Sequence, residues 1–333
     1  MMNKWYQHQG NNSDVVLYSQ VRLARNVLDA PFPNRMNREL TKNLSKKIWA
    51  TIKNSPVAND YNLINLADIS DVKAVSFAEK QLISPQFAKQ KSNAFVLSSN
   101  QDVSIMICEE DHIRINSFEA GQDLAKAYEK AQKTDDIFIS QLKIAFSDEL
   151  GFLTASPMNL GTGLKASFAL HLPALANQNA IYKLSAMVSK LGLSLRALNK
   201  DSAGDIFILS NLVSLGISEK SAIENLDAIC NQIVNQERNA REMLKDDTDF
   251  EDKIYRTLGI LQMARKIDVT EFSTYISLVR LGISLGYFDI SYKTVGDMIY
   301  NLQDASLIDS ADAELTAEMC KKLRAKLIRE KLG

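Results

Sequence analysis

The sequence predicts an α+β domain followed by an all-helical tail. Up to about residue 245, short apolar runs with strand spacing alternate with helical segments. The acidic stretch Asp246-Asp247-Thr248-Asp249 then marks a change, and nearly every later segment has helical periodicity. A chain of 333 residues is long enough for two domains. We expect a flexible arm over residues 1–14, an α+β domain over 15–245 and a helical domain over 246–333.

The elements follow from local patterns. Residues 14–25 begin as a strand and end in the basic pair Arg22 and Arg25, and Pro31 and Pro33 then break the chain. Helical spacing over 35–54 rests on Leu40, Leu44, Ile48 and Ile52. Ala94–Ser98 and Val103–Cys108 flank Ser99-Asn100-Gln101-Asp102, which indicates a hairpin, and 112–117 alternates as a third strand. Further strands are expected at 144–147, 151–155, 166–172, 192–198 and 205–214. Helices are expected at 119–132, 134–143, 174–190, 218–245, 250–267, 270–286, 291–303 and 311–332.

Composition excludes several classes of protein. The chain is 46% hydrophobic and 24% charged, with a formal net charge of −1, so it has no overall field for nucleic acid or membrane. No apolar run approaches the ~20 residues that a membrane span needs, and the N-terminal residues contain no apolar signal core. Cys108, Cys230 and Cys320 lack metal-ligand or paired spacing. We expect a cytoplasmic protein that binds neither nucleic acid nor membrane.

Two motifs carry the chemistry. Glu109-Glu110-Asp111-His112-Ile113-Arg114 follows an apolar run, and Gly161-Thr162-Gly163 lies within Gly151–Leu175, just before Lys165. A carboxylate at the end of an apolar run can act as a general base, which removes a proton from a reacting group. Adjacent strand residues face opposite ways, so only one of Glu109 and Glu110 can point into a site. The structural alternative is a solvated acidic turn, but the abutting apolar run weighs against it.

These two blocks resemble the ATP:guanidino phosphotransferases, the creatine and arginine kinase superfamily, and in particular the McsB-type protein arginine kinases. The resemblance spans residues from about Val15 to Leu332. It implies an antiparallel sheet flanked by helices, with the active site in a cleft, and a helical C-terminal domain used for dimers and partners. It also implies ATP and Mg²⁺ as cofactors, and proteins with exposed arginine as substrates. A homodimer, a zinc-finger-type adaptor and a Clp unfoldase, in stress response and protein quality control, are the partners it suggests.

The resemblance assigns site residues one by one. Glu110 matches the catalytic base, and Glu109, Ser156 and Asn159 complete the catalytic set. No protein ligand for a metal is expected. The nucleotide positions are Ser19, Gln20, Arg22, Gln81, Arg114, Lys165, Ala166, Ser167, Arg196, Asn199 and Asp201.

The sequence departs from the family pattern at several of these positions. Gln20 and Lys165 stand where relatives carry arginines, and a lysine lacks the fork that binds two phosphate oxygens. Gln81 replaces a histidine that faces adenine. Ser156 replaces a reactive cysteine whose thiolate helps hold the guanidinium. Cys108 stands in place of an asparagine, and the nucleotide loop after Arg196 is about three residues shorter.

The tail departs as well. Relatives carry an Arg-Asp-x-x-Arg-Ala element that recognises phosphoarginine. Here Cys320-Lys321 replaces the Arg-Asp pair and only Arg324 is kept. A basic amphipathic helix is therefore the preferred interpretation of residues 315–332.

Two functions remain open. The first is a protein-arginine kinase whose activity is weakened by these substitutions. The second is a pseudokinase that keeps the fold and acts as a scaffold or regulator in a Clp-type system. A kinase for free guanidino compounds is less favoured, because such enzymes resemble one another in a helical domain that would have to precede Arg22.

Overall fold

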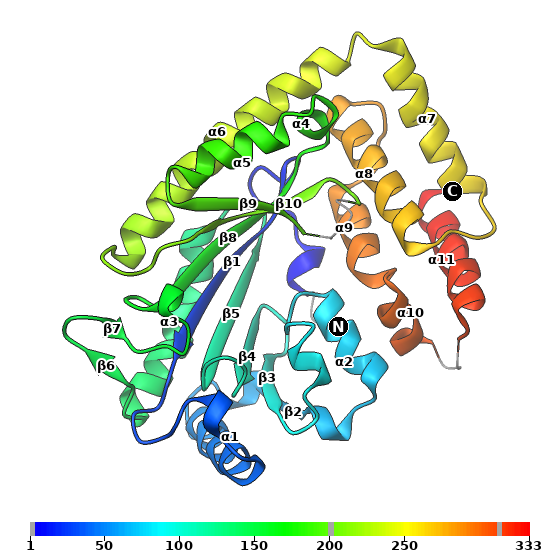
Figure 1. Ribbon diagram of the computed structural model, residues 1–333. Helices are drawn as coiled ribbons and strands as arrows, with labels where there is room; N and C mark the ends of the chain where they lie inside the picture. Colours follow the sequence, from blue (N-terminus) through cyan, green and yellow to red (C-terminus); the bar gives the residue numbers. More distant parts are fainter. Residues whose placement is uncertain (1–3, 199–202, 312–314) are drawn as a thin grey trace.

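The computed structural model describes residues 4–198, 203–311 and 315–333. Within these residues an eight-stranded sheet forms the centre of the protein, and every strand pairing in it is antiparallel (Figure 1). In sheet order the strands are β2 (Tyr61–Asn65), β3 (Ala94–Ser98), β4 (Val103–Ile107), β5 (Ile113–Ala120), β1 (Val16–Arg25), β8 (Leu164–His171), β10 (Ile206–Asn211) and β9 (Leu193–Ala197). A separate ribbon pairs β6 (Phe146–Ser147) with β7 (Gly151–Phe152). The predicted antiparallel sheet flanked by helices is confirmed.

The two faces of the sheet differ chemically, and strand β1 contributes side chains to both. It pairs with β5 on one side and β8 on the other. Side chains alternate along a strand, so Val21 and Leu23 enter one face while Gln20 and Arg22 enter the other. Val21 and Leu23 are buried in the larger apolar core.

Five helices belong to the layer on the apolar face. They are α1 (Arg38–Lys53), α3 (Leu124–Gln141), α4 (Pro173–Asn177), α5 (Ile181–Ser189) and α6 (Glu219–Leu244). Leu44, Ile48 and Ile52 bury the predicted stripe of α1 in the core. The side chains of Asn37, Asp123 and Ser218 accept hydrogen bonds from backbone N–H groups in the first turns of α1, α3 and α6.

Among the described residues, a second apolar cluster covers one end of the opposite face. There the short helix η1 (Trp5–Gln7) and α2 (Asp71–Glu79) pack with Tyr300 from the C-terminal helices. The Trp5 ring stacks on Phe118 with centroids 4.9 Å apart and meets Tyr300 edge-on at 5.2 Å. Residues 4–14, expected as a flexible arm, are therefore packed against the sheet. The cause is the aromatic pair Trp5 and Tyr6, which is buried within this cluster.

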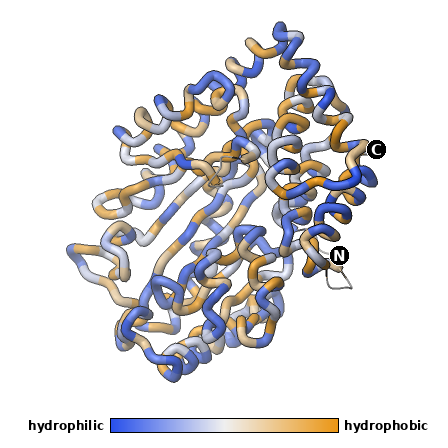
Figure 2. Tube along the Cα trace, turned by 45° about the vertical axis from the view of Figure 1, so that its right-hand side comes forward, coloured by the Kyte–Doolittle hydropathy of each residue, from blue (hydrophilic) through white to orange (hydrophobic). Residues whose placement is uncertain are grey.

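The C-terminal helices form a third core beside the sheet, grouped together in Figure 1. They are α7 (Thr248–Met263), α8 (Val269–Leu285), α9 (Tyr292–Asn301), α10 (Asp304–Ser310) and α11 (Ala317–Leu332). Buried Arg324 holds α11 in place, because it donates to the carbonyls of Leu302 and Ile267 and pairs with Asp304. Polar and apolar segments alternate along these helices (Figure 2), and no described helix is long and apolar enough to span a bilayer.

Several predicted boundaries are corrected. The two helices expected at 119–132 and 134–143 are one helix, α3, because Gln132-Lys133-Thr134 contains no helix breaker. The single helix expected at 174–190 is divided into α4 and α5, and its turn contains Asn179 at φ 56°. The helix expected at 311–332 begins later, at Ala317. Strand β2 and helix α2 were not predicted.

Buried Arg25, at the end of β1, connects three parts of the chain. It is 2% exposed, donates to Asp135 of α3 at 2.7 and 3.0 Å, and donates to the Thr162 carbonyl at 2.9 Å. Its guanidinium carbon lies 3.5 Å from the centroid of the Phe152 ring. The side chain thereby ties β1 to α3 and to the segment before β8.

We predict that Arg25→Ala lowers the free energy of unfolding by about 3–5 kcal/mol, because it leaves a buried carboxylate without its partner. Urea denaturation followed by circular dichroism measures the change. Lys133→Ala is the matched control, since it breaks an exposed pair with Glu129 on the same helix and should change stability by less than about 0.5 kcal/mol. A loss below about 1 kcal/mol for Arg25→Ala would contradict the assigned role.

Candidate active site

The uncovered half of the second face carries four cations, Arg22, Arg114, Lys165 and Arg196, here called the cationic strip. Arg22 of β1 pairs in register with Lys165 of β8. Cβ atoms of directly opposed residues are about 4.5–5.5 Å apart, so these two side chains stand next to each other. The strand registers place Arg114 of β5 and Arg196 of β9 on the same face.

Three members of the strip lack a partner. Among the described residues, the side chains of Arg22, Lys165 and Arg196 make no hydrogen bond or ion pair, whereas the Arg114 side chain pairs with Glu109. Burial lowers the pKa of Lys165 to about 8, and the charges of Arg22, Arg196 and Arg114 act in the same direction. Burial also lowers the pKa of Arg22 to about 9, with repulsion from Arg114 adding to it. Like charges directly opposed across strands are destabilising. The strip is therefore a site that an anion with several oxygens would stabilise.

The two adjacent glutamates have different environments. Glu109 accepts a hydrogen bond from Ser84 Oγ at 2.9 Å and one from the Glu110 N–H at 2.8 Å, besides its pair with Arg114. Burial opposes its ionisation, but the charge of Arg114 and these hydrogen bonds outweigh it and lower the pKa of Glu109. The Glu110 side chain is exposed and makes no hydrogen bond or ion pair with the described residues, although its charge acts on Arg22. The Glu109 carboxylate is therefore held in place by its contacts, whereas the Glu110 carboxylate can bind a ligand group.

The turn that carries these glutamates is joined to the segment bearing Ser156 and Asn159. Buried Asp111 accepts hydrogen bonds from the Asn26 amide at 2.6 Å and from the Ala155 N–H at 2.8 Å. A groove of about 470 Å³ opens there, lined by Glu110, Ala155, Asn93 and the N-terminal part of α1. Ser156 precedes the short helix η6 (Pro157–Asn159) directly after this groove. The arrangement leaves room for a side chain to reach Glu110.

The Gly161-Thr162-Gly163 motif is explained by backbone packing. Both glycines have positive φ, 93° and 65°. A Cβ atom on Gly163 would lie 2.7 Å from the Ala24 carbonyl oxygen, and one on Gly161 would lie 2.3 Å from that of Ser214. Only glycine allows the segment to run this close to β1 and to the chain after β10.

Not all predicted nucleotide residues reach the strip. Gln20 and Ser167 face each other beside it, 3.4 Å apart through their side chains. Ser19 points to the opposite face, where its hydroxyl donates to the Gly121 carbonyl at 2.7 Å and accepts from the Asp123 N–H at 2.8 Å. Ala166 lies in the apolar core. The side chains of Ser19 and Ala166 therefore do not line the strip.

The remaining predicted positions lie elsewhere. Gln81, at φ 62°, follows α2 and lines a cavity together with Leu198. Asn199 and Asp201 lie outside the described residues. Arg324 is fully buried, with all three guanidinium nitrogens engaged within the C-terminal helices. The described residues contain no cluster of three or more His, Cys, Asp or Glu side chains that could hold a metal ion.

Sequence reasoning missed the residues that support the glutamate turn. Ser84 holds Glu109, and the Asn93 amide donates to the Cys108 carbonyl at 2.7 Å. Cys108 itself has φ 56°, a backbone region in which asparagine is enriched. This conformation fits the asparagine that the family resemblance implies at this position. Asp111 also supports the turn, and its place in the Glu109-Glu110-Asp111-His112 motif could have indicated this from the sequence.

Comparison with known proteins decides the family. Residues 43–240 match the family described as ATP:guanido phosphotransferase, C-terminal catalytic domain. Residues 247–333 match the protein-arginine kinase McsB C-terminal domain. A protein-arginine kinase of Clostridium tetani is 35% identical over 338 residues, covering 99% of each chain. The chain belongs to the protein-arginine kinase family. A member from Geobacillus stearothermophilus is 37% identical over 340 residues, covering 99% of this chain and 94% of that one.

Solved structures agree on the fold. The duplicated taurocyamine kinase from Schistosoma mansoni, with bound transition state analog components, superposes with a TM-score of 0.64 and 24% identity over 74% of this chain. This chain spans 36% of the length of that duplicated enzyme. Lombricine kinase superposes with a TM-score of 0.61 and 18% identity, covering 69% of this chain and 68% of that one.

The pKa of Lys165, about 8, predicts a pH dependence for anion binding at the strip. Lys165 is mostly charged at pH 7 and mostly neutral at pH 9, so ATP affinity should fall about tenfold across this range. Calorimetry at several pH values measures it. Lys165→Arg is the control, because an arginine at this position keeps its charge to a higher pH and should reduce the dependence to the part that Arg22 contributes. Equal slopes for the two proteins would show that Lys165 does not contact the anion.

Proposed function

We propose that this family member transfers the γ-phosphoryl group of ATP to arginine side chains of proteins, at a reduced rate. One observation carries the proposal: three cations whose side chains have no partner among the described residues stand on one face of the sheet, and the charge of Glu110 acts on one of them, Arg22. The reaction needs phosphate binding and proton removal. The cations can bind the phosphates, and the Glu110 carboxylate can accept the proton.

The cationic strip would hold the phosphates. Arg22 and Arg196 supply planar forks that can each bind two oxygens, and Lys165 supplies a point charge. Arg114 is held in place by Glu109, which fixes its direction. Mg²⁺, which proteins commonly bind through substrate phosphates, would enter with the nucleotide and neutralise charge on the phosphate oxygens. In this family the cavity beside Gln81 and Leu198 would face the base.

The groove beside Glu110 would admit the acceptor arginine. Glu110 accepts a proton from the reacting guanidinium nitrogen, a bond forms between that nitrogen and the γ-phosphorus, and the bond from the γ-phosphorus to ADP breaks. Ser156 lies next to Ala155 at the groove and can donate a hydrogen bond, but it stays neutral. It therefore stabilises the cationic acceptor less than a thiolate would.

The substitutions at Gln20, Lys165 and Ser156 support a lowered rate. Each removes a charge or a bidentate contact from the phosphate or guanidinium side. Loss of one charged contact costs a few kcal/mol of transition-state stabilisation, roughly a hundredfold in rate. The same substitutions favour the second candidate function, a pseudokinase that acts as a scaffold or regulator in a Clp-type quality-control system.

For either function we propose a cytoplasmic homodimer, active in stress response, that works with a zinc-finger-type adaptor and a Clp unfoldase. Apolar side chains exposed on α7 support a partner surface: Tyr255 is 47%, Ile260 41% and Met263 71% exposed. Arg324 is committed to its own helices, so we propose no phosphoarginine pocket around it.

The first test of activity is phosphorylation of casein with MgATP. We expect slow, acid-labile labelling that disappears in Glu110→Gln, because an amide cannot accept the proton. Radiolabel transfer measures it, and Glu129→Gln, an exposed carboxylate on α3, is the matched control. Labelling that survives Glu110→Gln would reject the assigned base. Absence of both labelling and ATP binding would favour the scaffold.

A second test restores the family's residues. Ser156→Cys, Gln20→Arg and Lys165→Arg should together raise the labelling rate by roughly tenfold or more, since they return a thiolate and two forks. Initial rates at saturating ATP measure the gain. Lys190→Arg, at the end of α5, makes the same lysine-to-arginine change outside the site and should have no effect. A restored variant no faster than the starting protein would reject the charge argument.

A further inference from the structure

His112 closes the turn that carries Glu110, and it is fully buried. Its carbonyl accepts a hydrogen bond from the Cys108 N–H at 3.0 Å, and its own N–H donates to the Asn26 side chain at 2.9 Å. The backbone of His112 therefore belongs to the glutamate turn. The ring makes its hydrogen bonds elsewhere, with the segment that follows β1.

Two backbone groups fix the protonation state of the His112 ring. The Val27 N–H donates to Nδ1 at 3.0 Å, and Nε2 lies 2.8 Å from the Pro31 carbonyl oxygen. An amide N–H only donates and a carbonyl oxygen only accepts, so Nδ1 carries the lone pair and Nε2 carries the hydrogen. Burial lowers the pKa of His112, although the Pro31 carbonyl and the charge of Asp111 act in the opposite direction. The ring is therefore the neutral Nε2–H tautomer.

This ring connects the two parts of the chain that line the groove beside Glu110. One part is the turn after β4, which contributes Cys108, Glu109 and Glu110. The other part lies between Pro33 and Arg38, where the chain passes from β1 into α1. His112 belongs to the first part and binds Pro31, just before the second. The hydrogen bond from Nε2 to the Pro31 carbonyl therefore joins one side of the groove to the other.

Residues 29–36 have little else to hold them in a defined position. Among the described residues, their hydrogen bonds stay within residues 27–36, apart from the bond between the Pro31 carbonyl and His112. Pro31 and Pro33 have no N–H to donate. Ala30 and Met36 pack against the apolar core, but apolar contact has no fixed direction. Within the described parts of the chain, the His112 ring is thus the one directional contact between this segment and the rest of the protein.

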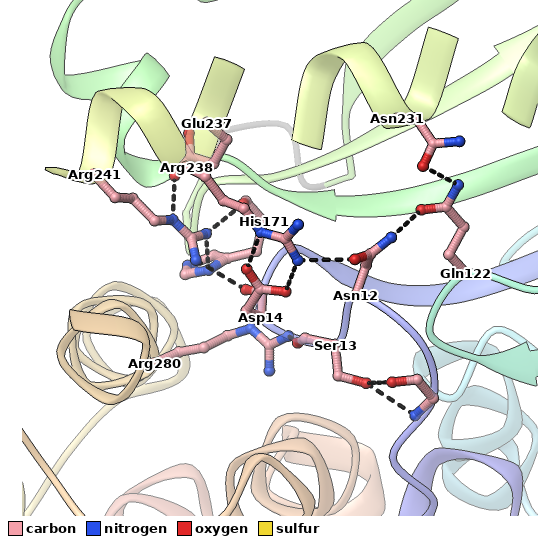
Figure 3. Close-up of polar contacts among 11 residues, drawn as sticks. Asn12, Ser13, Asp14, Gln122, His171, Asn231, Glu237, Arg238, Arg241 and Arg280 are labelled. Carbon is pink, nitrogen blue, oxygen red and sulfur yellow. Dashed lines mark hydrogen bonds and ion pairs between the residues drawn. The ribbon is translucent and has the colours of Figure 1, made fainter. Parts of the chain in front are cut away.

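The second buried histidine, His171, has different partners. Figure 3 shows His171 beside Arg241 of α6, whose Nη2 donates to the His171 carbonyl at 2.9 Å. The Nε2 atom of His171 lies 2.8 Å from Ser277 Oγ of α8. This ring contacts side chains of two long helices, not the backbone of a loop. His171 therefore serves as a reference for what burial of a histidine does away from the groove.

We propose that His112 is a positioning residue for the acceptor arginine, because its Nε2–H holds Pro31 and so fixes the side of the groove that faces the glutamate turn. This role rests on the proposed function, in which the groove admits the acceptor. A general base acts only when the reacting nitrogen lies within hydrogen-bond reach, and a displacement of ~1 Å can cost about a hundredfold in rate. Phosphate binding should not depend on His112, since Arg22, Lys165 and Arg196 lie on β1, β8 and β9.

The first test separates the two hydrogen bonds of the ring. In His112→Gln the amide nitrogen can stand near the place of Nε2 and donate to Pro31, whereas in His112→Asn the shorter amide stands near Nδ1 and does not reach Pro31. We expect kcat/KM for casein to fall roughly tenfold in His112→Asn and less than about threefold in His112→Gln. The Kd for ATP, measured by calorimetry, should be unchanged in both. Equal kcat/KM values in the two variants, or an equal loss of ATP affinity, would overturn the proposal.

The second test needs no kinase activity. Amide hydrogen exchange over residues 27–36, followed by mass spectrometry, should be roughly tenfold faster in His112→Asn and close to that of the unmodified protein in His112→Gln. His171→Asn is the matched control and should leave exchange over 27–36 unchanged. This difference without any casein labelling would reject the proposed function and still support the contact. Exchange unaffected by His112→Asn would overturn the role of His112.

A third measurement uses the unmodified protein, so it holds even if a variant does not fold. Nitrogen NMR of protein labelled with ¹⁵N-histidine reports which ring nitrogen carries the hydrogen. We expect His112, assigned by its loss in His112→Gln, to be the Nε2–H tautomer at pH 7. A charged ring or the Nδ1–H tautomer would overturn the proposal, because either form places a donor against the Val27 N–H.

Discussion

The facing pair of Arg22 and Lys165, on adjacent strands at the middle of the sheet, is the constraint around which the site is built. Two like charges at this position repel, and neither has a partner among the described residues. The sheet tolerates them because alternation along β1 sends Val21 and Leu23 into a large apolar core on the opposite face. That core supplies the burial that holds the strands in register, so the repulsion does not separate them. The charges on this half of the polar face are therefore held in place by the sheet before any ligand arrives.

The turn beside this face carries two adjacent glutamates, Glu109 and Glu110, whose contacts differ. Glu109 forms an ion pair with Arg114 and accepts a hydrogen bond from Ser84. These contacts fix the orientation of the Arg114 guanidinium in the cationic strip. The Glu110 side chain, one residue later, makes no such contact within the described parts of the chain. The division arises from backbone geometry, since the chain leaves β4 through Cys108 in a left-handed conformation and reverses at once into β5. A regular strand would have buried one of the two carboxylates in the apolar core.

Much of the fold could be predicted from local pattern, and the failures have physical causes. The central strands and long helices carry clear periodicity, whereas β2 is a half-exposed edge strand and α2 has only nine residues. The packed N-terminal segment was missed because its polar residues give no local sign that Trp5 stacks on Phe118, a residue distant in sequence. The cations of the strip came from motif matching. Ser19 and Ala166 were included with them although strand alternation, already applied to the two glutamates, places both on the opposite face. The pairing of Glu109 with Arg114 and the support from Asn93 depend on turns whose geometry the sequence does not encode locally.

The charges that remain at the site bear on whether it still binds phosphate. A scaffold without a nucleotide would be more stable if one of the opposed cations were neutral, since opposed like charges cost roughly 0.2–1 kcal/mol across a strand pair. Gln20 is neutral, its side chain accepts a hydrogen bond from Ser167, and its register partners, Phe118 and Ser167, are not cations. At the more repulsive position, Lys165 still carries a charge against Arg22. Lysine there weakens the geometry of phosphate binding but keeps its electrostatic basis. The retained charge of Lys165 opposite Arg22 therefore supports our proposal of a phosphate ligand, because relief of the repulsion alone would have removed the charge at Lys165 first.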